Sequence, residues 1–349
     1  MSAVIEGGCR AIPMESVRSL MFVPADRRDF LKGIMRFAPD GIVFDLQDSV
    51  APARKALARK ELESVRPTVL GTSWDSPMRP YLSVRINPIQ GGEGAEALEG
   101  QLEADVEAVL RSGVDGLVVP EVRSVDDVLA VDRQVTAAIG GSRPGGAGDA
   151  RRPELLVLFE TPESIDLVDE IVALRTDSRI GALLYGREDL TDHMGVPIRY
   201  AVGWDEPGTL YARSRLIWAA KRRHLPVLDS TPVVLRDEAI IGYESQSGRD
   251  LGFTGRACIH PAQIPVIDRA YAPSPDEVTR STDIVASYEA AVAAGGAVVV
   301  VDGALVDRPI AILHEKLLAR AESYRRQDAQ KQAWKARVGR EESTSGRAV

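Results

Sequence analysis

Eight short runs of apolar and β-branched residues recur along the chain, and stretches with helical patterning lie between most of them. The runs occupy residues 20–23, 41–44, 82–86, 116–119, 155–159, 182–185, 226–228 and 257–259. The helix-like stretches occupy residues 52–64, 98–111, 124–139, 162–174 and 210–224. Alternating strands and helices indicate a parallel sheet, and eight such units predict a closed (β/α)8 TIM barrel rather than an open sheet.

The predicted strands share a second feature, because each one ends in a polar or otherwise special residue. These residues are Asp26, Arg27, Asp45, Asp48, Arg85, Asn87, Glu121, Glu160, Arg187, Glu188, Asp189, Asp229 and His260. In an eightfold barrel all the carboxyl ends of the strands emerge on one face, where the catalytic residues of such enzymes lie. The sequence therefore predicts an active site at this face.

Charge and cysteine content exclude several classes of partner and site. The net charge of −8 argues against a nucleic-acid or anionic-membrane partner. Cys9 and Cys258 are far apart and lack a metal-ligand spacing, so neither a disulfide framework nor a zinc site is indicated. The chain shows no signal-peptide core and no apolar run of membrane-spanning length. We expect a soluble, cytoplasmic protein.

The pattern divides the chain into four parts. We expect an N-terminal extension at residues 1–16, the barrel at 17–270, a C-terminal lid and helix at 271–335, and a disordered tail at 336–349. The third part should hold helices at 275–294 and 309–333, separated by an apolar run and a turn. Residues 140–153, rich in glycine, proline and arginine, are predicted to form a mobile surface loop.

Several stretches together resemble a known family across residues 17–322. They include RSLMFVPADR (18–27), GIVFDLQDSVAPARKALAR (41–59), VRIN (84–87), LFETPESI (158–165), GREDL (186–190) and VDGALVDRP (301–309). The chain resembles the citrate-lyase β-subunit-like branch of the HpcH/HpaI aldolase family, which includes malyl-CoA and citramalyl-CoA lyases. The resemblance implies a Mg²⁺-dependent enzyme that acts on an acyl-CoA and a 2-oxo acid.

Glu160 and Asp189 are the candidate metal ligands. Two carboxylates at one barrel mouth form an oxygen-rich site that suits Mg²⁺ with water or substrate in the other positions. The resemblance implies the same two residues. The alternative is a solvated or salt-bridged carboxylate pair. Glu188 is expected beside the metal ligands rather than among them.

Arg85 is the candidate for stabilising a thioester enolate or holding a carboxylate, the role that the resemblance implies for it. An ion pair with Asp45 or Asp48 is the structural alternative, and the two roles are compatible. Asp45 and Asp48 are themselves candidate catalytic residues beside Arg85. By resemblance, Arg27 and Arg18 are candidates for contacting substrate or CoA phosphates. For Arg18, and for the face formed by Lys55 and Arg59, a phosphate contact and a solvated helix or strand end are both open.

The remaining candidates have mainly structural interpretations. His260 is predicted to be a hydrogen-bonded structural residue, while Met21, Phe22 and Trp218 are assigned to the core or the pocket wall. Asp307 alone would be a turn aspartate before a helix. The resemblance implies that it reaches the active site on a lid from a neighbouring subunit and acts as acid/base at the acyl α-carbon. It also implies a homotrimer or hexamer.

Four residues in three motifs depart from the family pattern. Gln47 stands in DLQD where many relatives have glutamate, and Glu121 stands in PEV where lysine is common. Ser230 and Thr231 replace a usual Gly-Val after Asp229. A neutral amide can hydrogen-bond but cannot transfer a proton as a carboxylate does. These differences leave the substrate open.

The sequence therefore predicts an acyl-CoA lyase that cleaves or forms a carbon–carbon bond of a malyl-CoA-like or citramalyl-CoA-like ester. Three alternatives remain: a thioesterase that uses the same site, a CoA-free aldolase of the pyruvate type, and a non-catalytic acyl-CoA-binding or scaffold subunit. The lid motif argues against the CoA-free aldolase.

Overall fold

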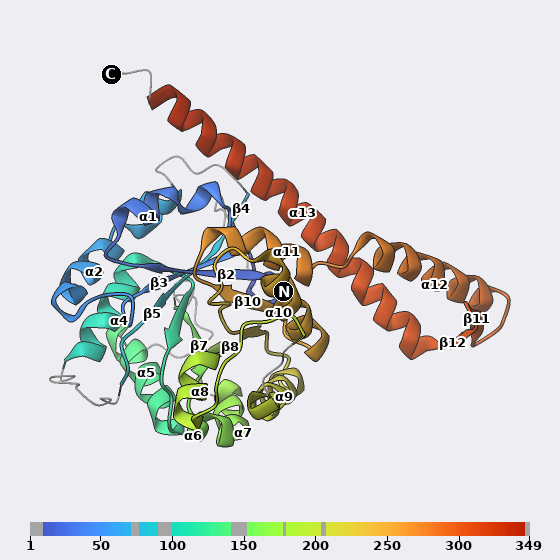
Figure 1. Cartoon of the computed structure of the whole chain (residues 1–349), viewed down its shortest axis with the longest axis horizontal. Coiled ribbons are helices and arrows are strands. Elements are labelled where there is room, and N and C mark those ends of the chain that lie inside the picture. Colours follow the sequence, from blue (N-terminus) through green and yellow to red (C-terminus); the bar gives the residue numbers. More distant parts are fainter. Residues whose placement is uncertain are drawn as a thin grey trace.

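A closed barrel of eight parallel strands forms the centre of the molecule (Figure 1). The computed structural model describes residues 10–70, 77–89, 100–140, 152–176, 179–203 and 207–345. In barrel order the strands are β10 (Gly255–Cys258), β2 (Ser19–Pro24), β3 (Gly41–Asp45), β5 (Tyr81–Arg85), β6 (Gly116–Val119), β7 (Glu154–Phe159), β8 (Ile180–Tyr185) and β9 (Val227–Asp229). The predicted TIM barrel is confirmed, since each apolar run falls on one of these strands.

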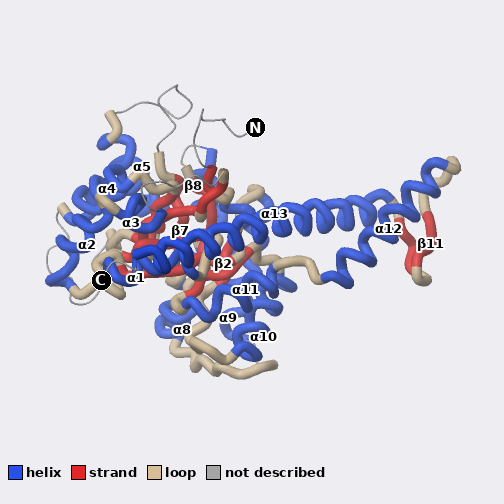
Figure 2. The backbone as a smooth tube through the Cα atoms, turned by 90° about the horizontal axis from the view of Figure 1, so that it is seen from above, coloured by secondary structure: helices blue, strands red, loops and turns tan. Residues whose placement is uncertain are grey.

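Helices surround the barrel, as Figure 2 shows. They are α1 (Arg28–Gly33), α2 (Lys55–Leu62), α3 (Val65–Leu70), α4 (Gln101–Ser112), α5 (Val125–Ala138), α6 (Pro162–Asp166), α7 (Val168–Ala173), α8 (Arg187–Met194), α9 (Pro207–Arg222), α10 (Glu238–Leu251) and α11 (Ile264–Tyr271). Side-chain caps define some starts: Ser124 and Asp127 form a capping box at α5, and Thr161 and Ser164 form one at α6. Among the described residues, no helix is both long and apolar enough to cross a membrane.

The barrel strands are buried on both faces, which explains their nearly continuous apolar sequences. Close strand packing excludes a side chain at the start of β10, where a Cβ on Gly255 would lie 2.2 Å from the carbonyl oxygen of Val17. The short strand β1 (Arg10–Ala11) pairs with β4 (Met78–Arg79), and Ile12 is fully buried. The described part of the predicted N-terminal extension thus packs against the barrel.

The C-terminal appendage forms an arm that projects from the barrel (Figures 1 and 2). It consists of α12 (Pro275–Ala293), the hairpin of β11 (Val299–Val301) and β12 (Ala304–Val306), and the first part of α13 (Arg308–Ser345). Ile284, Tyr288, Val306 and Ala311 form its own small core. Helix α13 continues to Ser345, so the tail predicted to be disordered from residue 336 is helical to that point. Most of the predicted loop at 140–153 lies outside the described residues.

The second half of α13 is attached to the barrel by a cluster of charged residues, here called the α13 anchor: Arg18, Asp40, Asp268, Asp328 and Lys331. Asp328 is half exposed, and the other side chains of the cluster are largely buried. The Arg18 guanidinium donates to Asp40 at 2.8 Å and to Asp328 at 2.6 Å, while Lys331 donates to Asp40 at 2.6 Å and also to Asp268. Burial alone would raise the pKa of Asp40, but Lys331 and Arg18 hold it below its ordinary value. The anchor therefore links the segments around Arg18 and Asp40, near the start of the barrel, to the C-terminal helix α13.

The prediction that Arg18 contacts substrate or CoA is wrong. Arg18 precedes β2 and therefore lies at the amino ends of the strands, opposite the mouth. It is fully buried, and its guanidinium lies 4.5 Å from the ring centroid of Tyr324.

Replacing Lys331 with methionine should destabilise the fold by about 3 kcal/mol, because it leaves the buried Asp268 and Asp40 carboxylates short of a cation. Urea unfolding followed by circular dichroism would measure the change. Lys316→Met, at an exposed position on the same helix, is the control and should leave the midpoint unchanged. Equal midpoints for the two variants would show that the anchor does not stabilise the barrel.

Candidate active site

A cavity of about 950 Å³ opens at the carboxyl ends of the barrel strands. Its charged lining residues are Asp45, Asp48, Arg85, Glu160, Glu188 and Asp189. Its apolar lining residues include Phe22, Phe30, Ile34, Phe37, Leu158 and Leu184. The predicted mouth is therefore a pocket that offers both charged and apolar groups to a ligand.

Glu160 lies directly after β7 and is only 2% exposed. Its Oε1 accepts a hydrogen bond of 2.7 Å from the backbone N–H of Glu121. Burial, together with repulsion from Asp189, raises the pKa of Glu160 well above its usual range. Asp189 comes from the first turn of α8, so two neighbouring strand ends bring the carboxylates together.

This donor set fits a divalent cation. A buried carboxylate that is repelled by its neighbour gains free energy when a cation lies between the two. The described residues contain no group of three or more His, Cys, Asp and Glu side chains arranged to hold a metal. A site with two protein carboxylates suits Mg²⁺, which commonly keeps several water ligands or takes substrate oxygens instead.

Arg85, the last residue of β5, faces the same cavity. Its Nε and Nη2 each donate to Asp45 at 2.7 Å, and its Nη1 lies 3.1 Å from Asp48. Burial alone would lower the pKa of Arg85, but Asp45 raises it, so the guanidinium stays charged. The predicted ion pairs with Asp45 and Asp48 are confirmed. They hold the guanidinium at the wall of the cavity.

Arg27 lies at the rim of the cavity. It is exposed, pairs with Asp29 at 3.1 Å, and stacks over Phe30 at 4.2 Å. Because Asp29 and Phe30 line the cavity, a ligand that extends from the pocket over α1 would meet this guanidinium.

Lys55 and Arg59 have structural roles instead of the predicted phosphate contact or solvated helix end. Lys55 donates to the carbonyl oxygens of Leu46 at 2.7 Å and Gln47 at 2.8 Å, and also to Asn87. Arg59 donates to Asp105 at 2.6 Å. These bonds hold the loop after β3 against the end of β5.

Four residues predicted to be structural have different outcomes. His260 is hydrogen-bonded as expected, since its Nδ1 accepts from the backbone N–H of Ala262 at 3.1 Å, and it also lines the cavity. Met21 and Phe22 are in the pocket wall. Trp218 is 80% exposed on the outer face of α9, so its assignment to the core or pocket is wrong. Its neighbours in sequence, Ile217 and Ala219, are buried instead.

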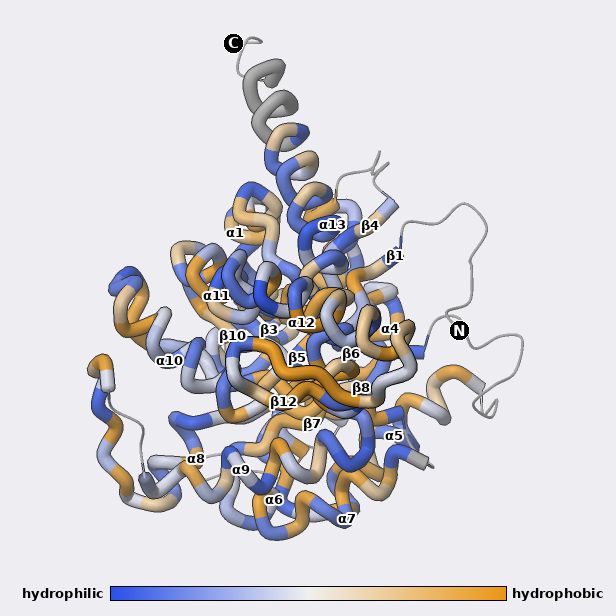
Figure 3. Tube along the Cα trace, turned by 90° about the vertical axis from the view of Figure 1, so that its right-hand side faces the viewer, coloured by the Kyte–Doolittle hydropathy of each residue, from blue (hydrophilic) through white to orange (hydrophobic). Residues whose placement is uncertain are grey.

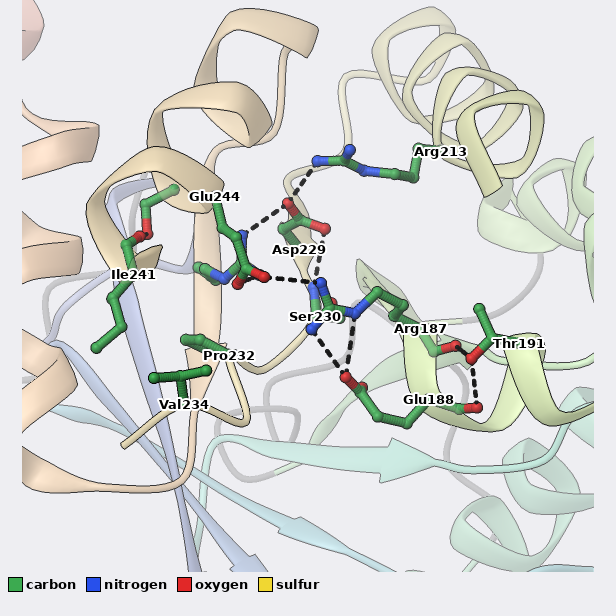
Figure 4. A network of polar contacts seen from close by, with 12 residues as sticks. Arg187, Glu188, Thr191, Arg213, Asp229, Ser230, Pro232, Val234, Ile241 and Glu244 are labelled. Atoms are coloured by element: carbon green, nitrogen blue, oxygen red, sulfur yellow. Dashed lines mark hydrogen bonds and ion pairs between the residues drawn. The ribbon is translucent and has the colours of Figure 1, made fainter. Parts of the chain in front are cut away.

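A buried network that was not predicted from the sequence lies behind the pocket wall (Figure 4). Asp229 accepts from Arg213 at 2.9 Å and from Arg256 at 3.2 Å, and Arg256 also donates to Glu244 at 2.9 Å. Arg187 links Glu244 to Glu188, with a bond of 3.0 Å to each. The network thus holds Glu188, beside the proposed metal ligands, against the helices. Arg213, Glu244 and Arg256 lie inside helices or a strand, where no strand-end signal marks them.

The two unusual residues of the sequence, Gln47 and Glu121, contact each other. The side-chain amide of Gln47 donates to Glu121 Oε1 at 2.9 Å. Burial raises the pKa of Glu121, and nearby Asp48 and Asp189 raise it further.

Asp307 is remote from this pocket within its own chain. It lies on the arm, immediately before α13, where its Oδ1 accepts a hydrogen bond of 3.2 Å from the backbone N–H of Ile310. No part of the arm lines the cavity.

Comparisons with known proteins agree with this geometry. The family model described as HpcH/HpaI aldolase/citrate lyase matches residues 18–261. The (3S)-malyl-CoA thioesterase of Cereibacter sphaeroides (strain KD131) is 29% identical over 309 residues, covering 88% of this chain and 95% of that protein. The citrate lyase subunit beta of Escherichia coli (strain K12) is 28% identical over 307 residues, covering 87% and 93%. The crystal structure of CitE from Mycobacterium tuberculosis with magnesium, acetoacetate and coenzyme A has a TM-score of 0.67 and 25% identity, covering 88% of this chain and 99% of that one.

Proposed function

Because the chain belongs to the HpcH/HpaI aldolase/citrate lyase family, we propose that it is a Mg²⁺-dependent acyl-CoA lyase. The proposed reaction cleaves or forms a carbon–carbon bond in a malyl-CoA-like or citramalyl-CoA-like ester. One observation carries this proposal: the Glu160 and Asp189 carboxylates and the Arg85 guanidinium meet in a single cavity. The ligands named for the similar CitE structure, magnesium, acetoacetate and coenzyme A, support the same assignment.

Glu160 and Asp189 would hold the metal ion. When bound, Mg²⁺ would orient the carboxylate and adjacent oxygen of the 2-hydroxy or 2-oxo acid unit and offset their negative charge. The buried position of Glu160 keeps this carboxylate in one place, and the Glu121 N–H fixes one of its oxygens.

Arg85 is proposed to stabilise the enolate at the thioester end. In the lyase direction the hydroxyl proton passes to a carboxylate of the cavity as the bond between the acyl α-carbon and the hydroxyl-bearing carbon breaks, giving glyoxylate or pyruvate and an acyl-CoA enolate. A preorganised cation lowers the energy of such a developing oxyanion. Asp45 provides the preorganisation, because it binds two guanidinium nitrogens. Arg27 is proposed to bind the CoA portion at the rim.

The enolate must then receive a proton at carbon, and Asp307 of a second copy is the proposed donor. Within one chain Asp307 lies on the projecting arm and does not line the cavity, so it would serve a pocket only through assembly. The β11–β12 hairpin beside it exposes Val298, Val300 and Leu305, and Figure 3 shows this end of the arm as hydrophobic. Such a surface suits contact with another subunit. We propose a homotrimer or hexamer.

Hydrolysis of the thioester is the second candidate function. The similarity to a protein named (3S)-malyl-CoA thioesterase favours it. In that reaction water adds to the thioester carbonyl, and the same arginine would stabilise the oxyanion.

The products distinguish these functions. With malyl-CoA and citramalyl-CoA, Mg²⁺-loaded protein should release acyl-CoA together with glyoxylate or pyruvate, and EDTA should reduce turnover by at least about 100-fold. Mass spectrometry would resolve these products. Free CoA with an intact hydroxy acid would identify a thioesterase, whereas CoA-ester binding without turnover would indicate a scaffold subunit. Undiminished turnover in EDTA would exclude the metal mechanism.

A further inference from the structure

We propose that Gln47 and Glu121 act as one positioning unit that orients the Glu160 carboxylate for metal binding. The inference rests on the proposed function, since it concerns the metal site assigned there. Neither residue is proposed to touch the metal or the substrate.

The unit is a short chain of hydrogen bonds. The buried Gln47 side chain donates to Glu121 Oε1 at 2.9 Å, and the Glu121 backbone N–H donates to Glu160 Oε1 at 2.7 Å. Holding the Glu121 side chain therefore also restrains the peptide group that binds the metal ligand. Partners that orient metal ligands in this way commonly affect metal affinity.

The backbone at Glu121 explains why this restraint is needed. Its φ is +46°, in the left-handed region that residues with a Cβ rarely adopt. The φ angle sets the direction of the N–H that Glu160 accepts. A strained corner persists only where its surroundings hold it, and the bond from Gln47 is one such contact.

The other end of the unit reaches Arg85. The backbone N–H of Gln47 donates to Asp45 Oδ1 at 3.0 Å, and the same oxygen accepts from Arg85 Nε. A continuous set of contacts thus runs from the proposed enolate-binding arginine to the proposed metal ligand. The unit would fix the distance between the two reactive parts of the site.

The contact also matches the charges around it. A glutamate at 47 beside Glu121 would place two carboxylates in contact, which is unfavourable next to Asp48 and Asp189. The neutral amide of Gln47 instead donates a hydrogen bond to the Glu121 carboxylate.

The test measures Mn²⁺ binding to the metal-free protein by electron paramagnetic resonance, with no substrate present. Gln47→Ala and Glu121→Ala should each raise the Kd by about 10- to 100-fold. The Kd of the double variant should be no higher than that of the weaker-binding single variant, because both substitutions break the same contact. If the losses of Mn²⁺-binding free energy in the two single variants add up in the double variant, the two residues act independently. That result would overturn the proposal.

Glu121→Gln separates hydrogen bonding from charge. It keeps an oxygen that accepts from Gln47 but removes the negative charge, so its Kd should stay within about threefold of wild type. A loss as large as that of Glu121→Ala would show that the charge acts, and would overturn the proposal. The matched control is Gln246→Ala, which removes an exposed amide bond to Asp250 of 2.8 Å on α10 and should bind Mn²⁺ normally.

Failure of the proposed function would look different. If wild-type protein does not bind Mn²⁺, or Glu160→Ala binds it as tightly, the metal site itself is wrongly assigned. If wild type binds and Glu160→Ala does not, while both Ala variants at 47 and 121 bind as wild type, only the positioning unit is refuted.

Discussion

Glu160→Ala and Asp189→Ala are each expected to lower turnover of an acyl-CoA substrate by at least about 1000-fold, with the barrel still folded. Loss of a bound metal removes several kcal/mol of transition-state stabilisation, and each tenfold in rate corresponds to about 1.4 kcal/mol. Glu160 is buried against Asp189 at the mouth, so its removal relieves a repulsion and should not lower the melting temperature. Steady-state kinetics and thermal unfolding would test both statements.

Glu163→Ala is the matched control, because Glu163 lies three residues further along the chain but its side chain is 50% exposed and pairs with Arg123 on the surface. It should keep wild-type activity. Normal turnover in Glu160→Ala or Asp189→Ala would refute the metal mechanism. Unfolding of either variant would instead show that the carboxylate is part of the fold.

Asp307→Asn should reduce kcat by about 100-fold or more with little change in KM. Asparagine keeps an oxygen that can accept from Ile310, so the start of α13 should remain intact, while the proton donor is lost. Stopped-flow or steady-state assays under saturating Mg²⁺ would measure the split between kcat and KM. Normal turnover would show that Asp307 only caps the helix.

Complementation tests whether Asp307 acts on another subunit. Asp307→Asn and Glu160→Ala inactivate different parts of the site, so a mixed oligomer should contain some pockets with both an intact barrel and an intact arm. The mixture must be dissociated and reassembled, and mass spectrometry should confirm subunit exchange. Recovered activity supports action in trans. No recovery after verified exchange would place the arm and the pocket in the same chain.

The sequence predicted the barrel well because its signal is local. Each strand is a short apolar run, and a strand buried on both faces needs no partner in the sequence to be recognised. The same logic found Asp45, Arg85, Glu160 and Asp189, since strand ends mark the mouth of any eightfold barrel. Only residues that follow a strand lie at the mouth, however, and residues that precede a strand lie at the other end of the barrel. Arg18 precedes its strand and so lies at the opposite face.

Contacts between distant segments could not be predicted in the same way. Gln47 and Glu121 are each unusual in the sequence, but nothing in their spacing of 74 residues indicates that they touch. The charges of the α13 anchor join residues up to 310 positions apart. The prediction that Trp218 is buried was wrong because its helix has apolar residues on several sides. The sequence of such a helix does not show which of these residues faces water.

Helix α13 gives the arm a fixed length and a fixed rotation. It starts beside Asp307 and meets the barrel at Asp328 and Lys331, so about 23 residues, or roughly 35 Å of continuous helix, separate the two points. Each residue inserted between them would extend the arm by about 1.5 Å and turn its tip by about 100°. The spacing between the anchor and Asp307 is therefore constrained in angle as well as in length, and among small insertions those near whole helical turns preserve the orientation of the tip.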